Sequence, residues 1–368
     1  MGYIFILFAV WIYALFIRRK GYILAAIAFA WMAYLGGTAS PFGTFDYIDY
    51  QVIYNRTAMG IDTRTEWLYT SLSKIAINRG LYYNQFRIIL IVCIFILLYI
   101  AVVRLTKKPI YVAAFFMIVP FFQEVTQVRS FAAYTIVLLG ISFLDTLSIK
   151  KIVFYYMINF LAMGFHTSAG IFLILPLVQY AIEKNGIDKS IRFSIWVSVL
   201  LASCMYLLSK GTFVVNLISR FVEMIAGSTV ATTFSTLMSV SRGSKSYFLI
   251  IYVAYLVLAL LISVKGKDAL IYVKYLGLYA GFIITFALTP ILLISTQFNR
   301  LQRYGFELAM IILVVMWSKA RIADAKLRLV IVCLVTTVLA CAFYGVFTNG
   351  DTFRTSIPYL MHWIGYTN

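Results

Sequence analysis

Long apolar segments separated by short polar turns run through the whole chain. Many of the apolar segments approach or exceed the length that crosses a bilayer, and the turns between them carry most of the charged residues. A spanning helix needs about 20 apolar residues, so the alternation predicts a bundle of membrane helices. The predicted spans are 3–17, 21–37, 86–103, 110–122, 130–147, 152–164, 167–182, 192–208, 246–264, 269–294, 304–318 and 328–347.

Two of these spans are too short for a full crossing. Residues 110–122 and 152–164 fall well below about 20 residues, and Pro120 ends the first of them. Such pieces predict helices broken at membrane depth, or a cavity in the outer half of the membrane, where irregular backbone must be covered by protein or water. The sequence therefore predicts an all-α, polytopic integral membrane protein with about 11–13 transmembrane or partly re-entrant helices.

The distribution of basic residues predicts the orientation of the helices. Lys and Arg follow each odd-numbered span in short clusters, beginning with Arg18, Arg19 and Lys20. A signal peptide has its positive charges before the apolar run, whereas the first cluster here follows it, so the run is interpreted as an uncleaved span. Turns rich in Lys and Arg face the cytoplasm, so the odd-to-even turns are assigned there.

The opposite set of loops then lies outside the cell. The external regions are a loop with amphipathic segments at 38–85, a loop at 209–245 and a C-terminal segment at 348–368. All belong to a single multi-span membrane domain covering residues 1–368. Most of the unusual polar residues fall on this outer side, so we expect the protein to act on something at the outer face of the membrane.

The composition excludes an ordinary water-soluble globular protein. Of the 368 residues, 63% are hydrophobic and 12% are charged, whereas soluble domains carry about 25% charged residues. The net charge of +18 is explained by membrane topology, so we expect no nucleic-acid partner. The four cysteines (Cys93, Cys204, Cys333 and Cys341) lie in apolar runs without metal-ligand spacing, which predicts buried structural thiols, no metal site and no cofactor.

A first polar block follows the second span. Asp46, Asp49 and Tyr50 have the spacing that would place them on one helical face, with Tyr47 and Tyr54 beside them. Carboxylates accept hydrogen bonds from sugar hydroxyls, tyrosine rings stack on sugars, and one carboxylate could act as a general base. The alternatives are a solvated interfacial helix in the aromatic belt, or a magnesium-binding DxxD motif of a prenyltransferase, whose second acidic motif is missing here.

Two further charged residues stand at predicted helix boundaries on the outer side. Glu66 either forms a capping box with Thr63 or supplies a second external carboxylate. Arg129 interrupts apolar sequence, with Glu124 as a candidate partner. Arginine grips phosphate through two parallel hydrogen bonds, and the alternative is an arginine that snorkels to lipid headgroups.

The remaining candidates are a histidine and an arginine pair. His166 marks a break between two apolar runs and is a candidate general base, hydroxyl partner or packing residue, while Thr167 or Ser168 would cap the next helix. Arg300 and Arg303 are three residues apart and share a helical face. Together with Arg129 they would neutralise a diphosphate, or alternatively bind lipid headgroups.

The order of these motifs resembles the EpsG-type, Wzy-like polysaccharide polymerases of bacteria. The resemblance rests on G-x-x-D-Y-x-x-Y at 43–50, E-x-x-Y-x-x-L at 66–72, R-x-x-A-A at 129–133 and F-H-x-S at 165–168, and it covers residues 36–182. Two positions depart from the family pattern. No arginine precedes the aspartate block within residues 35–40, and Ser130 stands where glutamine is expected.

The resemblance implies a GT-C-like, metal-independent glycosyltransferase in the bacterial plasma (inner) membrane, with its active site facing outside. Its substrate would be an undecaprenyl-diphosphate-linked oligosaccharide, and membrane lipids, a chain-length regulator and a flippase would be its partners. The polymer would be a secreted polysaccharide, a capsule or an O-antigen. The predicted site comprises catalytic Asp46, Asp49, Glu66 and His166, diphosphate-binding Arg129, Arg300 and Arg303, and sugar-binding Tyr47, Tyr50 and Tyr54.

Three other functions fit an apolar chain of this kind. A flippase or transporter of lipid-linked oligosaccharide would need a polar path to both faces, but the ionisable residues within the spans gather toward the outside. A membrane sugar O-acyltransferase would need a catalytic group reachable from the cytoplasm, where the predicted turns offer mainly basic residues. A structural scaffold would leave the external arginines and carboxylates without a role.

Overall fold

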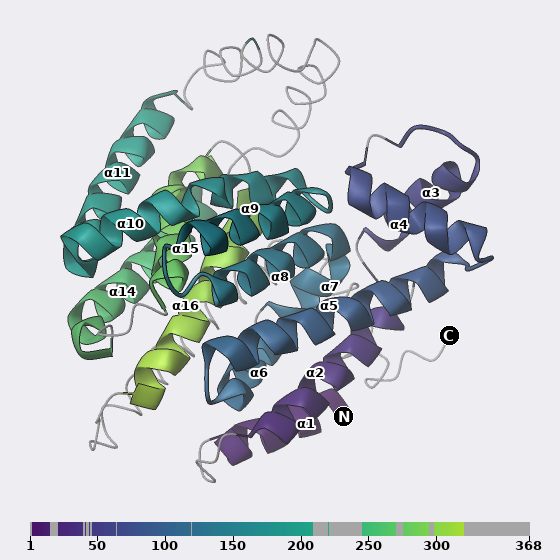
Figure 1. Cartoon of the computed structure of the whole chain (residues 1–368), viewed down its shortest axis with the longest axis horizontal. Helices are drawn as coiled ribbons and strands as arrows, with labels where there is room; N and C mark the ends of the chain where they lie inside the picture. Colours follow the sequence, from purple (N-terminus) through teal and green to yellow (C-terminus); the bar gives the residue numbers. More distant parts are fainter. Residues whose placement is uncertain are drawn as a thin grey trace.

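The computed structural model is helical throughout the part of the chain that it describes (Figure 1). It describes residues 2–14, 21–39, 41, 44, 46–63, 65–118, 120–208, 220, 245–269, 275–293 and 298–319. The helices are α1 (Gly2–Ile12), α2 (Tyr22–Gly37), α3 (Tyr47–Ala58), α4 (Trp67–Asn78), α5 (Tyr83–Leu105), α6 (Pro109–Ile118), α7 (Phe121–Thr126), α8 (Val128–Phe143), α9 (Ile149–Met163), α10 (Leu175–Asn185), α11 (Ile187–Leu208), α14 (Lys245–Ala269), α15 (Leu276–Ala287) and α16 (Asn299–Lys319), with 3₁₀ helices η2 (Thr167–Ile174) and η4 (Thr289–Leu293).

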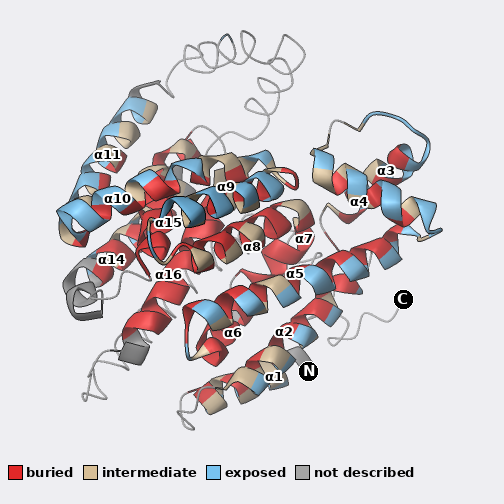
Figure 2. Ribbon diagram, in the orientation of Figure 1, coloured by how far each residue is buried: buried red, intermediate tan, exposed pale blue. Residues whose placement is uncertain are grey.

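Apolar surfaces on the outside of the bundle mark a membrane protein. Two stretches are long and apolar enough to cross a bilayer, α5 and the continuous run Leu276–Leu293 formed by α15 and η4. Helix α9 turns the apolar side chains of Val153, Met157 and Phe160 outward, at the spacing of one helical face. Figure 2 shows such exposed faces around a buried interior. The number of crossings and their orientation stay predictions.

The predicted break near Pro120 is present. Helix α6 ends at Ile118, Pro120 is the N-cap of α7, and all six residues of α7 are buried. Gln127 then separates α7 from α8 with a non-helical backbone (φ −103°, ψ 60°). This irregular backbone lies inside the protein, which is where membrane proteins tolerate it.

Helices α3 and α4 form a pair beside the bundle (Figure 1). The backbone amides of Leu68 and Tyr69 donate to the carbonyl oxygen of Gly164 at 2.9 and 3.1 Å. Gly164 allows this approach because a Cβ there would lie 2.6 Å from Cβ of Leu68. The start of α4 is thereby fixed to the end of α9, which positions the neighbouring Glu66.

Arg87 joins four segments that the chain separates widely. Its guanidinium is buried and donates to the carbonyl oxygens of Gly36 (3.2 Å) at the end of α2 and Val125 (2.7 Å) in α7. It also lies over the ring of Tyr47 in α3, 5.1 Å from the centroid. Arg87 was not among the residues selected from the sequence, although an arginine in the first turns of a long apolar helix is the signal that would have found it.

Some predictions are corrected and others lie beyond the described residues. The prediction of buried thiols is wrong for Cys93 and Cys204, which are exposed. Both side chains lie on the outward faces of their helices, α5 and α11. Most of the 209–245 loop, the span predicted at 328–347 and the segment 348–368 lie outside the described residues.

Candidate functional site

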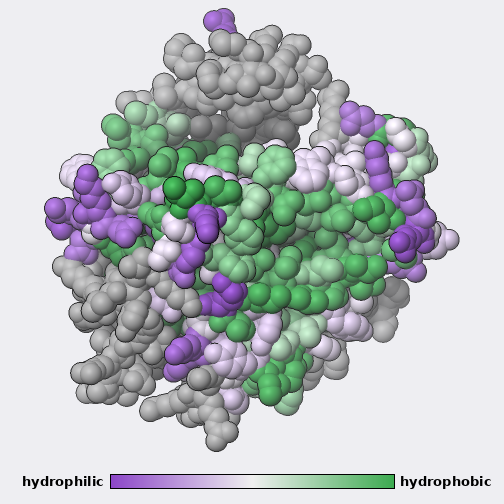
Figure 3. Space-filling model, viewed as in Figure 1, coloured by the Kyte–Doolittle hydropathy of each residue, from purple (hydrophilic) through white to green (hydrophobic). Residues whose placement is uncertain are grey.

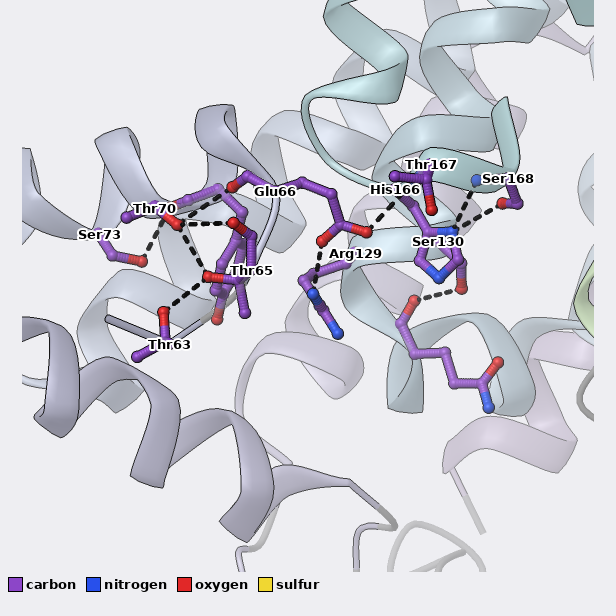
Figure 4. Close-up of polar contacts among 12 residues, drawn as sticks. Thr63, Thr65, Glu66, Thr70, Ser73, Arg129, Ser130, His166, Thr167 and Ser168 are labelled. Carbon is purple, nitrogen blue, oxygen red and sulfur yellow. Dashed lines mark hydrogen bonds and ion pairs between the residues drawn. The ribbon is translucent and has the colours of Figure 1, made fainter. Parts of the chain in front are cut away.

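Polar side chains converge where α4, α8, η2 and α16 begin. Figure 4 shows Glu66 at the start of α4, Arg129 in the first turn of α8 and His166 before η2. Arg300 and Arg303 come from the first turn of α16. Helix ends therefore bring together residues that lie far apart in the sequence.

Glu66 and Arg129 form an ion pair. Nη1 of Arg129 donates to Oε2 of Glu66 at 2.5 Å, and the amide of Thr167 donates to Oε1 at 3.3 Å. The guanidinium also lies over the rings of Tyr50 and Tyr69, at 5.4 and 5.9 Å from their centroids. Glu66 is the N-cap residue of α4 but makes no side-chain capping bond, so the capping-box interpretation is wrong.

Glu124 pairs with Arg303, and not with Arg129 as the sequence suggested. Nε of Arg303 donates to Oε1 of Glu124 at 2.6 Å, and Nη2 donates to Oε1 of Gln127, also at 2.6 Å. The carboxylate and the guanidinium are both buried. Glu124 and Arg129 are five residues apart, which does not place them on one helical face, and the break at Gln127 also separates their helices.

This buried pair predicts a strong stability effect. Arg303→Met leaves the Glu124 carboxylate buried without its counter-charge, and we expect a loss of about 3–5 kcal/mol in the free energy of unfolding. The double variant Arg303→Met with Glu124→Gln removes both charges and should recover part of that loss. Thermal unfolding of the purified variants in detergent measures the difference, and a single variant as stable as the wild type would contradict the prediction.

His166 contacts Arg300 through one ring nitrogen and Ser168 through the other. Nε2 lies 3.0 Å from Nη1 of Arg300, and Nδ1 lies 2.7 Å from Oγ and 3.2 Å from the amide nitrogen of Ser168. The backbone amide of Ser168 donates to Nδ1, so Nδ1 is an acceptor at the start of η2. The guanidinium of Arg300, which can only donate, lies against Nε2. His166 itself is the N-cap of η2, so the prediction that Thr167 or Ser168 caps this helix is wrong.

The surroundings keep the imidazole neutral. Burial and the positive charge of Arg300 lower the pKa of His166 to about 3. Both ring nitrogens lie against neighbouring groups, Nε2 against Arg300 and Nδ1 against Ser168. The catalytic role of His166 stays a prediction.

Acidification should weaken this part of the fold. The folded-state pKa of His166 lies below its ordinary value of about 6.5, so the stabilisation is complete above pH 6.5 and is lost as the pH falls toward 3. Between pH 7 and pH 5 we expect the wild type to lose about 2 kcal/mol more than His166→Gln, which cannot take up the proton. Equal losses in thermal unfolding at the two pH values would contradict this.

Asp46 and Asp49 occupy different surroundings. Asp46 precedes α3 with φ 60° and is half-buried, whereas Asp49 is exposed in the first turn. Among the described residues, Asp46 is the non-glycine residue with positive φ, a conformation found at functional sites. Asp46 is the N-cap residue of α3, its carbonyl oxygen accepts the first helical bond from Tyr50, and the charge of Asp49 acts on it. The two carboxylates therefore lie near each other but differ in burial.

Three arginines act on Asp46 and on His166. Burial raises the pKa of Asp46, while the charges of Arg300, Arg129 and Arg303 act in the opposite direction. The same three arginines lower the pKa of His166. Asp46 and His166 therefore share one electropositive environment.

The three tyrosines of the first motif differ in their contacts. Tyr47 packs edge-on against Tyr83, and Tyr54 stacks on Phe86 while its hydroxyl donates to the carbonyl oxygen of Leu81 at 2.8 Å. Both rings are buried against α5. Tyr50 instead faces the guanidinium of Arg129. The sugar-binding role of all three stays a prediction, with Tyr50 nearest to the charged groups.

Comparison with protein families identifies the family of this chain. The model of the EpsG family matches residues 22–361, which include every residue of the predicted site. The chain belongs to the EpsG family. This is the family of EpsG/Wzy-like polysaccharide polymerases, which confirms the resemblance and indicates a membrane-bound exopolysaccharide polymerase-type function. Comparisons with curated proteins and with solved structures gave no match.

Three members of the site in this EpsG-family chain were not selected from the sequence. Tyr69 supports Arg129, as described above. Tyr304 donates to the carbonyl oxygen of Ser130 at 2.7 Å and stacks on Tyr134 at 4.7 Å. Glu307 is buried one turn after Arg303. A glutamate inside a predicted span was the available signal for Glu307, and Tyr69 is the tyrosine of the E-x-x-Y-x-x-L motif at 66–72.

The described residues of this EpsG-family chain contain no group of three or more His, Cys, Asp or Glu side chains that could hold a metal ion. The positive charge near Asp46 comes from guanidinium groups. Within the same part of the chain, Arg129 and Arg303 each have a carboxylate partner, whereas no carboxylate forms an ion pair with Arg300. Among these three arginines, Arg300 is therefore the one without an ion-paired carboxylate, and its charge acts on the nearby Asp46.

Proposed function

We propose that this EpsG-family protein is a GT-C-type glycosyltransferase that joins undecaprenyl-diphosphate-linked oligosaccharide repeat units at the outer face of the bacterial plasma membrane. One observation carries the proposal. Arg300 lacks a carboxylate partner among the described residues and lies in the same electropositive environment as the half-buried Asp46. The diphosphate leaving group needs a positive charge, which Arg300 supplies. The attacking sugar hydroxyl needs a base, which Asp46 supplies.

The transfer consists of one displacement at the anomeric carbon. The hydroxyl oxygen of the acceptor unit forms the new bond to this carbon while its proton passes to the Asp46 carboxylate. The bond between the anomeric carbon and the diphosphate oxygen breaks, and its electron pair stays on the leaving lipid diphosphate. Arg300 stabilises that charge, with Arg129 and Arg303 beside it. The energy comes from the diphosphate bond of the donor, so the reaction takes no nucleotide.

The other residues position these groups. His166 holds Arg300 through Nε2, and Glu66 holds Arg129 in front of Tyr50. The ring of Tyr50 is buried beneath the guanidinium of Arg129 and supports it. Guanidinium groups supply the positive charge that a divalent cation provides in other diphosphate sites, so we propose that the transfer is metal-independent.

Lipid-linked intermediates in a deletion strain test this function. Loss of the gene should leave single repeats on the carrier at the outer face and no polymer, and the intact gene should restore polymer. Purified protein in proteoliposomes should extend lipid-linked repeats without nucleotide and in the presence of EDTA. Repeats that accumulate on the cytoplasmic face would instead identify a flippase and overturn the proposal. An unchanged polymer that lacks acyl groups would indicate an O-acyltransferase.

A further inference from the structure

An apolar groove of about 270 Å³ runs along α5 between α4 and α8. Its walls include Leu72 and Ala76 of α4 and Ala132 and Ile136 of α8. Along α5 it extends from Phe86 to Leu97, roughly 16 Å at the rise of an α-helix. In Figure 3, hydrophobic surface continues over this part of the molecule.

One end of the groove adjoins the candidate site. Ala132 lies one helical turn after Arg129 on α8, and Phe165, which also lines the groove, immediately precedes His166. From there the groove descends to Ile136 and Leu97. A ligand with an anionic group at the arginines could therefore extend an apolar chain along α5 without leaving the protein surface.

We propose that this groove binds the isoprenoid chain of the lipid-linked substrate, an inference that rests on the proposed function. The occupant follows from the two ends of the site. Arg300 at one end suits the diphosphate, and the walls of the groove are almost entirely apolar. A volume of about 270 Å³ along roughly 16 Å of α5 is small, so it fits a stretch of one apolar chain, as a polyprenyl carrier has, better than the paired chains of a phospholipid.

Two native cysteines make a direct test possible on the unaltered protein. Cys93 lines the groove, whereas Cys204 lies on α11 outside it, and both are exposed. Maleimide labelling of the purified protein, followed residue by residue with mass spectrometry, should slow about ten-fold at Cys93 when undecaprenyl diphosphate is present at ten times its Kd. Labelling of Cys204 should not change. Phosphatidylglycerol at the same concentration should protect neither cysteine.

Substitutions on α5 provide a second measurement. Ile89 lines the groove and Ile96 does not, although both lie on α5 with similar exposure (51% and 53%). Ile89→Trp should weaken binding of undecaprenyl diphosphate about ten-fold, because the indole displaces a stretch of apolar chain. Ile96→Trp should bind as the wild type does, and thermal unfolding establishes that both variants are folded.

The outcomes separate this inference from the proposed function. Equal protection of Cys93 by phosphatidylglycerol would mean that the groove holds bulk lipid, and unprotected Cys93 would mean that the chain binds elsewhere. Either result overturns the groove proposal, while polymerisation that depends on Arg300 would still stand. Protection of Cys93 in a protein that forms no polymer would uphold the groove and reject the polymerase.

Discussion

Arg300→Ala is expected to reduce polymer synthesis about 100- to 1000-fold, the loss typical of removing one group that stabilises a developing negative charge. Arg300 lacks a carboxylate partner among the described residues, so its charge is available to the diphosphate. Arg300→Lys keeps the charge but loses the planar, two-pronged geometry, and it should retain an intermediate activity. The measurement is the rate of chain extension from lipid-linked repeats by the purified variants.

Arg56 offers a matched control for this experiment. It is an exposed arginine in the last turn of α3, so Arg56→Ala removes the same charge from the outer region without touching the site. Its activity should stay near that of the wild type. Similar losses in Arg56→Ala and Arg300→Ala would show that total positive charge matters, and would reject a specific role for Arg300.

Asp46→Asn is expected to lower the rate of chain extension about 100- to 10,000-fold, because the amide cannot take the proton from the acceptor hydroxyl. The substitution keeps the size of the side chain, and asparagine tolerates the left-handed backbone of Asp46. Folding should therefore be preserved. The substrate affinity should change much less than the maximal rate, since the carboxylate acts on the reacting proton.

Asp49→Asn is the control within the same motif. Asp49 is exposed in the first turn of α3, so we expect a rate within about three-fold of the wild type, as surface substitutions usually give small effects. A larger loss in Asp49→Asn than in Asp46→Asn would reverse the two roles. The pair also decides between the carboxylates that the sequence left as equal candidates.

The sequence predicted the members of the site better than their partners. Glu66 and Arg129 are 63 residues apart, and His166 and Arg300 are 134 apart. Arg129 and His166 were selected as polar residues between apolar runs, and Glu66 as a capping residue or external carboxylate. Helix ends on one side of a bundle gather such residues, and a hydrophobicity pattern is enough to find them. The order of the motifs also predicted the family correctly.

Pairing depends on backbone direction, which the sequence pattern does not contain. Glu124 and Arg129 are five residues apart on opposite sides of the break at Gln127, and Glu124 pairs with Arg303. Asp46 has a positive φ as the N-cap residue of α3, and it is more buried than the neighbouring Asp49. The capping box failed because α4 begins at Trp67, which makes Glu66 the N-cap residue and not the third residue of the helix.

The position of Asp46 among the arginines has a consequence for the timing of the reaction. Glu66 and Glu124 balance Arg129 and Arg303, and Asp46 offsets Arg300. In the proposed transfer, Asp46 takes up the hydroxyl proton and loses its negative charge as the leaving diphosphate gains one, so we expect the product to bind tightly at this stage. Loss of that proton would restore the negative charge beside Arg300 and weaken binding of the product. We therefore expect the spent carrier to be released when Asp46 returns to its ionised state.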